Sequence, residues 1–136
     1  LCAACMENIQ FELLQGNMEV NMGSILENMF AQAVKCNGFS LNYFESKKYG
    51  ELDFVIQNGL KVDLLEIKSG NDYMKHSALK RVSNVENWKF GRKLVFCKGN
   101  VETEDTVEYL PWYMVMFYKP EAVPENLIYQ VDLSGV

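Results

Sequence analysis

The chain has 136 residues, of which 49% are apolar and 23% are charged. This length suffices for one domain with a hydrophobic core, and the composition argues against disorder. No apolar run approaches the roughly 18 residues needed to cross a membrane, and the first residues lack the basic start and apolar stretch of a signal peptide. Because the chain begins at Leu1 instead of Met, we expect a piece of a longer protein.

The four cysteines are too few and too irregularly spaced for a disulfide scaffold. Cys2 and Cys5 form half of a zinc motif without a second half, and a structural zinc needs four ligands. Cys36 and Cys97 fall in apolar settings, so we expect buried thiols. Free thiols favour a reducing, cytoplasmic location.

The N-terminal part predicts two helices. Residues 2–15 are compatible with a short helix that Gly16-Asn17 ends. Apolar residues recur from 22 to 36 with the 3.6-residue period of an amphipathic helix, which Asn37-Gly38 would stop. Glu27 falls at the edge of the apolar stripe of this second helix. The residues of that stripe are Met22, Ile25, Leu26, Met29, Phe30, Ala33 and Val34.

Three strands are expected next, at Ser40–Glu45, Leu52–Gln57 and Lys61–Lys68. Asn58-Gly59 between the last two is a strong signal for a two-residue hairpin turn. The remaining elements are predicted as a loop from Ser69 to Asp72, a helix over Tyr73–Trp88, a buried strand at Leu94–Cys97, an acidic loop at Glu102–Asp105, a strand at Val107–Leu110 and a helix over Trp112–Tyr118. The order α-β-β-β-α-β with a β/α end predicts one α/β domain over residues 1–136, with a central mixed β-sheet flanked by helices.

Three charged residues stand where apolar ones are expected in the hairpin. They are Asp53, Glu66 and Lys68. With Asn58-Gly59 as the turn, Asp53 faces Leu64 and is a diagonal neighbour of Glu66, and strand alternation puts all three charges on one face. A turn two residues longer would place Asp53 opposite Glu66 on the same face, whereas a turn one residue longer would separate them.

This arrangement suits a divalent cation. Mg²⁺ is held by one or two carboxylates together with waters and phosphate oxygens, and Asp53 and Glu66 can supply the carboxylates. The backbone carbonyl of Ile67 could add a third oxygen. Lys68 would then lie beside an attacking water and a phosphate, and Glu27 could complete the acidic cluster. The alternative is structural: Asp53 as an edge-strand charge and Glu66 paired with Lys68 on a solvated face.

The charge distribution is uneven. The net charge is -5, which argues weakly against a nucleic-acid partner. Eleven of the 13 Lys and Arg residues, but six of the 18 acidic residues, lie between Lys47 and Lys98. The basic stretch from 47 to 98 therefore contains the hairpin with Asp53, Glu66 and Lys68, as expected of a phosphate-facing surface. Ordinary solvated faces remain the alternative explanation.

The residues also match a known pattern. A helix Glu (Glu27), an Asp (Asp53) and a Glu-x-Lys (Glu66, Lys68) resemble the PD-(D/E)xK, or restriction-endonuclease-like, superfamily. More narrowly, the chain resembles the uncharacterised C-terminal nuclease-fold domain of prokaryotic AAA+-type ATPases over roughly residues 20–120. The matching segments are Gly23–Asn28, Tyr43 with Glu51–Val55, Glu66–Gly70, Ser77–Leu79 and Leu110–Tyr113. No proline precedes Asp53, a departure at a position that varies in the superfamily.

The resemblance implies a restriction-endonuclease-like core and a site of Glu27, Asp53, Glu66 and Lys68 with Mg²⁺ or Mn²⁺. It also implies an ATPase domain upstream in the same chain. The sequence has no Gly-x-x-x-x-Gly-Lys-(Ser/Thr) segment, so ATP hydrolysis is not assigned to these residues.

Three functional hypotheses follow. The first is a metal-dependent endo- or exodeoxyribonuclease. The second is a catalytically silent nuclease-fold module that binds DNA or protein and regulates the ATPase, for which Trp112–Tyr118 is a candidate docking surface as well as a candidate core helix. The third is a structural domain whose charges stabilise one another. A homo-oligomer is left open.

Overall fold

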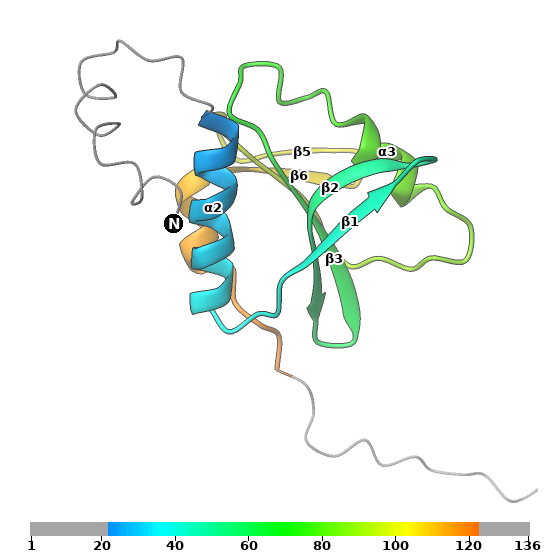
Figure 1. Cartoon of the computed structure of the whole chain (residues 1–136), viewed down its shortest axis with the longest axis horizontal. Helices are drawn as coiled ribbons and strands as arrows, with labels where there is room; N and C mark the ends of the chain where they lie inside the picture. The colour runs from blue at the N-terminus through cyan, green and yellow to red at the C-terminus, as the bar shows by residue number, and fades with distance from the viewer. Residues whose placement is uncertain (1–21, 123–136) are drawn as a thin grey trace, which may run out of the picture.

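A computed structural model describes residues 22–122 and has a mixed six-stranded sheet with helices on both of its faces (Figure 1). The elements are α2 (Met22–Cys36), β1 (Asn42–Ser46), β2 (Gly50–Asn58), β3 (Lys61–Ile67), α3 (Ser77–Ser83), β4 (Lys93–Cys97), β5 (Glu102–Glu104), β6 (Val107–Pro111) and the 3₁₀-helix η1 (Trp112–Phe117). The expected α/β class with a mixed sheet is therefore confirmed. Residues 1–21 and 123–136, with the helix expected at 2–15 and Cys2 and Cys5, lie outside the described residues.

The sheet combines an antiparallel and a parallel half. Its strand order is β1-β2-β3-β4-β6-β5. β1, β2 and β3 are antiparallel neighbours, β4 runs parallel to β3 and to β6, and β5 pairs antiparallel with β6 at the edge. The β3-α3-β4 segment is a parallel crossover, in which the helix covers one face of the sheet.

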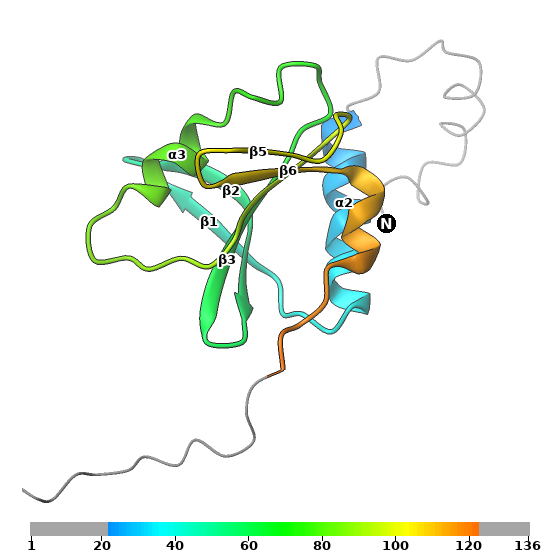
Figure 2. The same cartoon turned by 180° about the vertical axis from the view of Figure 1, so that it is seen from behind.

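Two hydrophobic clusters lie on the two faces. Beneath α2 and η1, Phe30 and Val34 pack with Phe54, Leu65 and Phe96. Beneath α3, a second cluster contains Leu64, Leu79, Val95 and Tyr109. Figure 2 shows α2 and η1 side by side on one face, with α3 on the other. The continuous burial of β3 and β4 follows from their position between covered faces.

The hairpin turn differs from the expected one by a single residue. Asn58 pairs with Lys61, so the turn residues are Gly59 and Leu60 and the register moves by two residues. Asn58 is 3% exposed and its amide donates to Asp63, which keeps it in the strand. Gly59 has a φ of +61°, and a glycine at the first turn position is typical of a type II′ turn.

Three other elements also differ from those expected. The helix expected over Tyr73–Trp88 is confined to Ser77–Ser83. It begins after His76, which is buried against Tyr109. The acidic segment Glu102–Glu104, expected as a loop, is an exposed edge strand. Trp112–Phe117 forms a 3₁₀-helix instead of an α-helix.

Among the cysteines, Cys97 is buried, as expected from its apolar surroundings, and Cys36 is exposed, contrary to expectation. Cys36 is the last residue of α2, beyond the buried stripe that ends at Val34. In the part of the chain from residue 22 to 122, no helix has the length and apolar character to span a membrane.

Candidate functional site

A β-bulge positions Asp53. Asn42 of β1 pairs with Val55 of β2, and Phe44 pairs with Leu52. Two residues of β2, Asp53 and Phe54, therefore lie opposite one residue of β1. A bulge of this kind bends the strand and redirects a side chain. We expected Asp53 to share a face of the sheet with Glu66 and Lys68 because side chains alternate along a regular strand. That alternation does not hold at Asp53, because the strand is bulged there.

The carboxylate of Asp53 contacts the β3 backbone within the Glu-x-Lys segment. Its Oδ2 accepts a hydrogen bond from the N–H of Ile67 at 2.6 Å. The paired register of β2 and β3 ends at Phe54 and Leu65, so Asp53 and Glu66 are the residues that come directly beyond the last pair. Asp53 and the Glu66–Lys68 segment are thus in direct contact, through a turn that is shifted by one residue and keeps its two-residue length.

Glu66 is a buried carboxylate that is incompletely paired. It aligns with Val95 of β4, and 6% of its surface is exposed. Its Oε1 lies 2.5 Å from Nζ of Lys68, whose side chain is 31% exposed. Its Oε2 is buried and has no hydrogen-bond partner. An unpaired buried carboxylate oxygen is costly, so a partner such as a cation or an ordered water is expected there.

The backbone of Lys68 is fixed on both sides. Its N–H donates to the carbonyl of Phe96 at 2.8 Å, and its carbonyl accepts a hydrogen bond from Nε1 of Trp112 at 3.1 Å. The residue following β3 is therefore held by β4 and by the start of η1. Trp112 was not among the site residues expected from sequence, because its contact depends on the sheet order.

Glu27 reaches the site from α2. It is exposed, and it lines a pocket of about 250 Å³ together with Asp53. Glu51, two residues before Asp53 in β2, also lines this pocket and was missed by the sequence analysis. The only available signal was its spacing of two residues from Asp53, which is common in any strand.

The four candidate charges are electrostatically coupled at Asp53. Burial raises the pKa of Asp53 from its ordinary value of 3.8 to about 6. The N–H of Ile67 lowers this pKa, the carboxylates of Glu66 and Glu27 raise it, and the ammonium of Lys68 lowers it. A carboxyl group shifted this way by burial and neighbouring charges is typical of functional sites, although structural networks also produce such shifts.

The donor set fits a sparsely ligated cation. In residues 22–122, no group of three His, Cys, Asp or Glu residues could hold a metal ion. Asp53 and Glu66 supply two carboxylates, and the unpaired Oε2 of Glu66 is available. The N–H and C=O of a strand residue point toward the same neighbour, so the Ile67 carbonyl lies on the Asp53 side. Two carboxylates with water suit Mg²⁺ or Mn²⁺ and do not suit a structural zinc.

Comparison with known proteins identifies a family. Residues 22–115 match the family model described as Domain of unknown function (DUF4143). The chain belongs to this family. The DUF4143 match begins with α2 and includes all four candidate residues and most of η1. No curated protein and no solved structure matches the chain.

Proposed function

We propose that this DUF4143 domain is a metal-dependent nuclease of the PD-(D/E)xK type, with a restriction-endonuclease-like core, which hydrolyses phosphodiester bonds of DNA. The observation that carries the proposal is the contact of Asp53 with Ile67, which joins Asp53 to Glu66 and Lys68. The coupling of Glu27 to Asp53 supports it.

Asp53 and Glu66, with the carbonyl of Ile67, would hold Mg²⁺ or Mn²⁺. When bound, such an ion polarises a phosphoryl oxygen and acidifies a bound water. Lys68 carries three N–H donors, and one of them is directed at Glu66. The other two are available to orient a water or to stabilise the charge that develops on the phosphate. Glu27, across the pocket from Asp53, would accept a hydrogen bond from a water molecule there.

The surface charge supports a nucleic-acid substrate. The stretch from 47 to 98 has five more basic than acidic residues. Most of its basic side chains are exposed, and exposed Lys and Arg supply the phosphate contacts that dominate binding to nucleic acids. The exposed ones are Lys47, Lys48, Lys61, Lys75, Lys80, Arg81, Lys89 and Lys98.

The resemblance of the sequence to AAA+-associated domains supports a partner within the same chain. We propose that an AAA+-type ATPase domain precedes this one in a longer protein and presents DNA to it. A homo-oligomer would follow from such an ATPase.

Incubation with end-labelled single-stranded and duplex DNA, and with RNA, in Mg²⁺ or Mn²⁺ tests the activity. We expect cleavage by the wild type and at least a hundredfold loss in Asp53→Asn and Lys68→Met, because each removes a group that acts on the phosphate or the ion. Asp72→Asn is the matched control, since Asp72 is an exposed carboxylate paired with Lys75. Absence of cleavage on every substrate, or equal cleavage by all variants, would contradict the proposal.

A catalytically silent module that binds DNA or protein and regulates the ATPase is the second candidate. It is favoured by the lack of a three-ligand group within residues 22–122 and by the pairing of Lys68 with Glu66. In this case labelled DNA would bind in EDTA, no metal would promote cleavage, and Asp53→Asn would bind with unchanged affinity.

A further inference from the structure

A cluster of four aromatic rings reaches the surface beside α3. Trp88 is at its centre, with its ring centroid 6.2 Å from that of Phe44, 6.1 Å from that of Tyr49 and 5.9 Å from that of Phe90. Trp88 is nevertheless 46% exposed. The tip between β1 and β2 lies beside α3 in Figure 1, and Figure 2 shows it on the side away from α2 and η1. Three rings therefore hold a fourth that remains open to water.

Basic side chains accompany these rings. Nζ of Lys48 lies 5.0 Å from the centre of the Tyr49 ring, and Nε of Arg81 donates to the carbonyl of Tyr49 at 3.0 Å. Both basic residues are exposed, and among residues 22–122 neither takes part in a salt bridge. We call this region the Trp88 surface, made of Phe44, Lys48, Tyr49, Arg81, Trp88 and Phe90.

The acidic residues of the β1–β2 hairpin lie on the opposite face. Phe44 pairs with Leu52, and both pack in the cluster beneath α3. Glu45 and Glu51 form the next pair, so alternation puts them on the other side of the sheet, where Glu51 lines the pocket of Asp53. Residues 77–92, which include α3, contain four basic residues and one acidic residue: Lys80, Arg81, Lys89, Arg92 and Glu86. The Trp88 surface is therefore basic as well as aromatic.

Exposed rings combined with basic groups suit a single strand of nucleic acid. Unpaired bases stack on exposed aromatic side chains, and Lys and Arg neutralise the phosphates between them. In a duplex the faces of the bases are already stacked on one another, so an exposed ring adds little to the affinity. The exposed ring of Trp88 therefore favours a single strand over a duplex.

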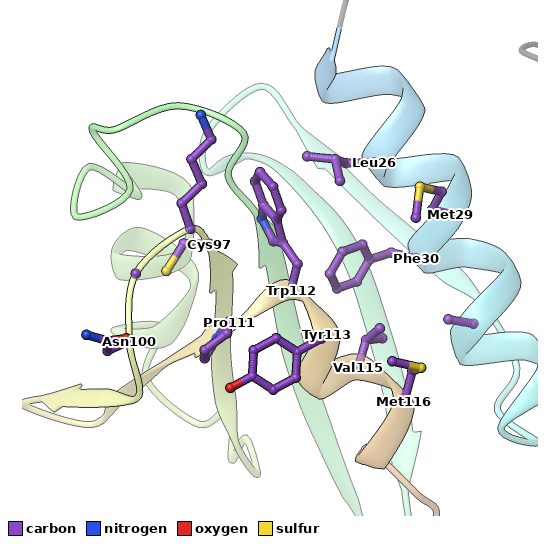
Figure 3. A pocket seen from close by; sticks show the side chains of 13 residues that line it. Leu26, Met29, Phe30, Cys97, Asn100, Pro111, Trp112, Tyr113, Val115 and Met116 are labelled. Atoms are coloured by element: carbon purple, nitrogen blue, oxygen red, sulfur yellow. The ribbon is translucent and has the colours of Figure 1, made fainter. Parts of the chain in front are cut away.

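The groove between α2 and η1 has a different character. It has a volume of about 700 Å³, and Figure 3 shows Phe30 on one side and Trp112 on the other. Lys98 is the one charged residue among those that line it. Tyr113 at this groove is 59% exposed, so it offers an open ring with fewer basic neighbours. Tyr113 is therefore a matched control for Trp88.

We propose that the Trp88 surface binds single-stranded DNA, with Trp88 stacked on a base and with Lys48 and Arg81 on phosphates. The choice of DNA rests on the proposed function, whereas the binding requires neither metal nor cleavage. Gly50 at the hairpin tip and Asp53 belong to the same strand, three residues or about 10 Å apart. The Trp88 surface and the candidate site are thus neighbours.

Fluorescence anisotropy of labelled oligo(dT), titrated with the protein in EDTA, tests the stacking. We expect Trp88→Leu, which keeps an apolar side chain without a ring, to weaken binding by at least about fivefold. Trp88→Phe keeps a ring and should retain most of the affinity. Tyr113→Leu should bind like the wild type. Absence of binding by the wild type, or equal binding by Trp88→Leu, would overturn the proposal.

Salt and duplex DNA separate the ring from the charges. Lys48→Gln should reduce the slope of log affinity against log salt by about 0.7, because one phosphate contact is lost, and Trp88→Leu should leave that slope unchanged. On a blunt duplex of the same length Trp88→Leu should bind like the wild type. An equal loss on duplex and single strand would contradict stacking. Dependence on Trp88 with oligo(rU) but not with oligo(dT) would identify RNA and overturn the assignment to DNA.

Tryptophan emission reports the contact directly. The chain has two tryptophans, so Trp112 alone remains in Trp88→Phe. We expect oligo(dT) to quench the emission of the wild type, because a base stacks on Trp88, and most of this quenching to disappear in Trp88→Phe. Quenching that persists in Trp88→Phe would count against the proposal. Cleavage of duplex DNA without binding of oligo(dT) would overturn this inference alone, and Trp88-dependent binding without any cleavage would overturn the proposed nuclease activity alone.

Discussion

The carboxylate of Asp53 accepts the backbone N–H of Ile67 at 2.6 Å, so a bulged residue of β2 bonds to the central residue of the Glu66-Ile67-Lys68 segment. The bulge interrupts the regular pairing of β2 with β1 at Asp53, whereas Ile67 lies on β3, on the other side of β2. The side chain of Asp53 supplies the acceptor, and the same contact places its charge beside those of Glu66 and Lys68. The arrangement is consistent with a site whose charges are tolerated because a cation can join them.

Asp53→Asn should stabilise the metal-free protein at neutral pH. The pKa of Asp53 is about 6 in the folded state against 3.8 ordinarily, so its ionised form weakens the fold above pH 6. Between these values the folded state binds the proton first, and stability rises as pH falls. The penalty at pH 7 is at most about 3 kcal/mol, and Asn retains an acceptor for the N–H of Ile67.

Urea unfolding in EDTA from pH 4 to pH 8 measures this effect. The advantage of Asp53→Asn over the wild type should be largest above pH 6 and should disappear near pH 4. A variant that is less stable than the wild type by the same amount at every pH would refute the electrostatic account.

Lys68→Ala should destabilise the fold, and Glu66→Gln should rescue it. Removal of Lys68 leaves the buried carboxylate of Glu66 without its 2.5 Å partner, at a cost of about 1–3 kcal/mol. Neutralising Glu66 in the double variant removes that penalty. Urea titration of the wild type, both single variants and the double variant gives the coupling free energy between Lys68 and Glu66. Cleavage, if present, should be lost in all three, which separates a catalytic role from a purely structural one.

Asp63 should be essential to stability. It is 2% exposed and accepts hydrogen bonds from Asn58, from the hydroxyl of Tyr118 and from the backbone N–H of Arg92. We expect Asp63→Ala to lower the free energy of unfolding by about 3 kcal/mol or more, since two buried donors and one partly buried donor lose their acceptor.

Gly91→Ala tests the same hydrogen bonds of Asp63 without changing Asp63 itself. A methyl group at Gly91 would lie 2.2 Å from Oδ1 of Asp63. The variant should therefore unfold at a lower urea concentration than the wild type. Gly70→Ala is the control, because its nearest atom would be 4.0 Å away. Equal midpoints for the two glycine variants would contradict this role of Asp63.

The elements with regular periodicity were predictable from the sequence. The apolar stripe of α2 and the apolar runs of β3 and β4 predicted the correct elements, because the apolar positions in these segments are the ones that are buried. The turn was misplaced because Asn58 has a tertiary role that no local signal reveals, namely its bond to Asp63. The start of α3 was misplaced for the same kind of reason, because His76 is buried against Tyr109.

The site was predictable as a set of residue types but not as geometry. Spacing identified Asp53, Glu66 and Lys68, the position of Glu27 at the edge of the α2 stripe added a fourth residue, and the family resemblance contained the same four. The bulge at Asp53 depends on pairing with β1, and the contact of Trp112 with Lys68 depends on the order of distant strands. Neither can be read from a local pattern.

We propose that Asp53 and Glu66 together hold a divalent cation. The most direct test is thermal unfolding at pH 7.5 with and without millimolar Mn²⁺, for the wild type, Asp53→Asn and the surface control Asp72→Asn. A ligand that binds only the folded state must stabilise it. We predict that Mn²⁺ raises the melting temperature of the wild type and of Asp72→Asn and leaves that of Asp53→Asn unchanged. No shift in the wild type, or an equal shift in all three proteins, would contradict the claim.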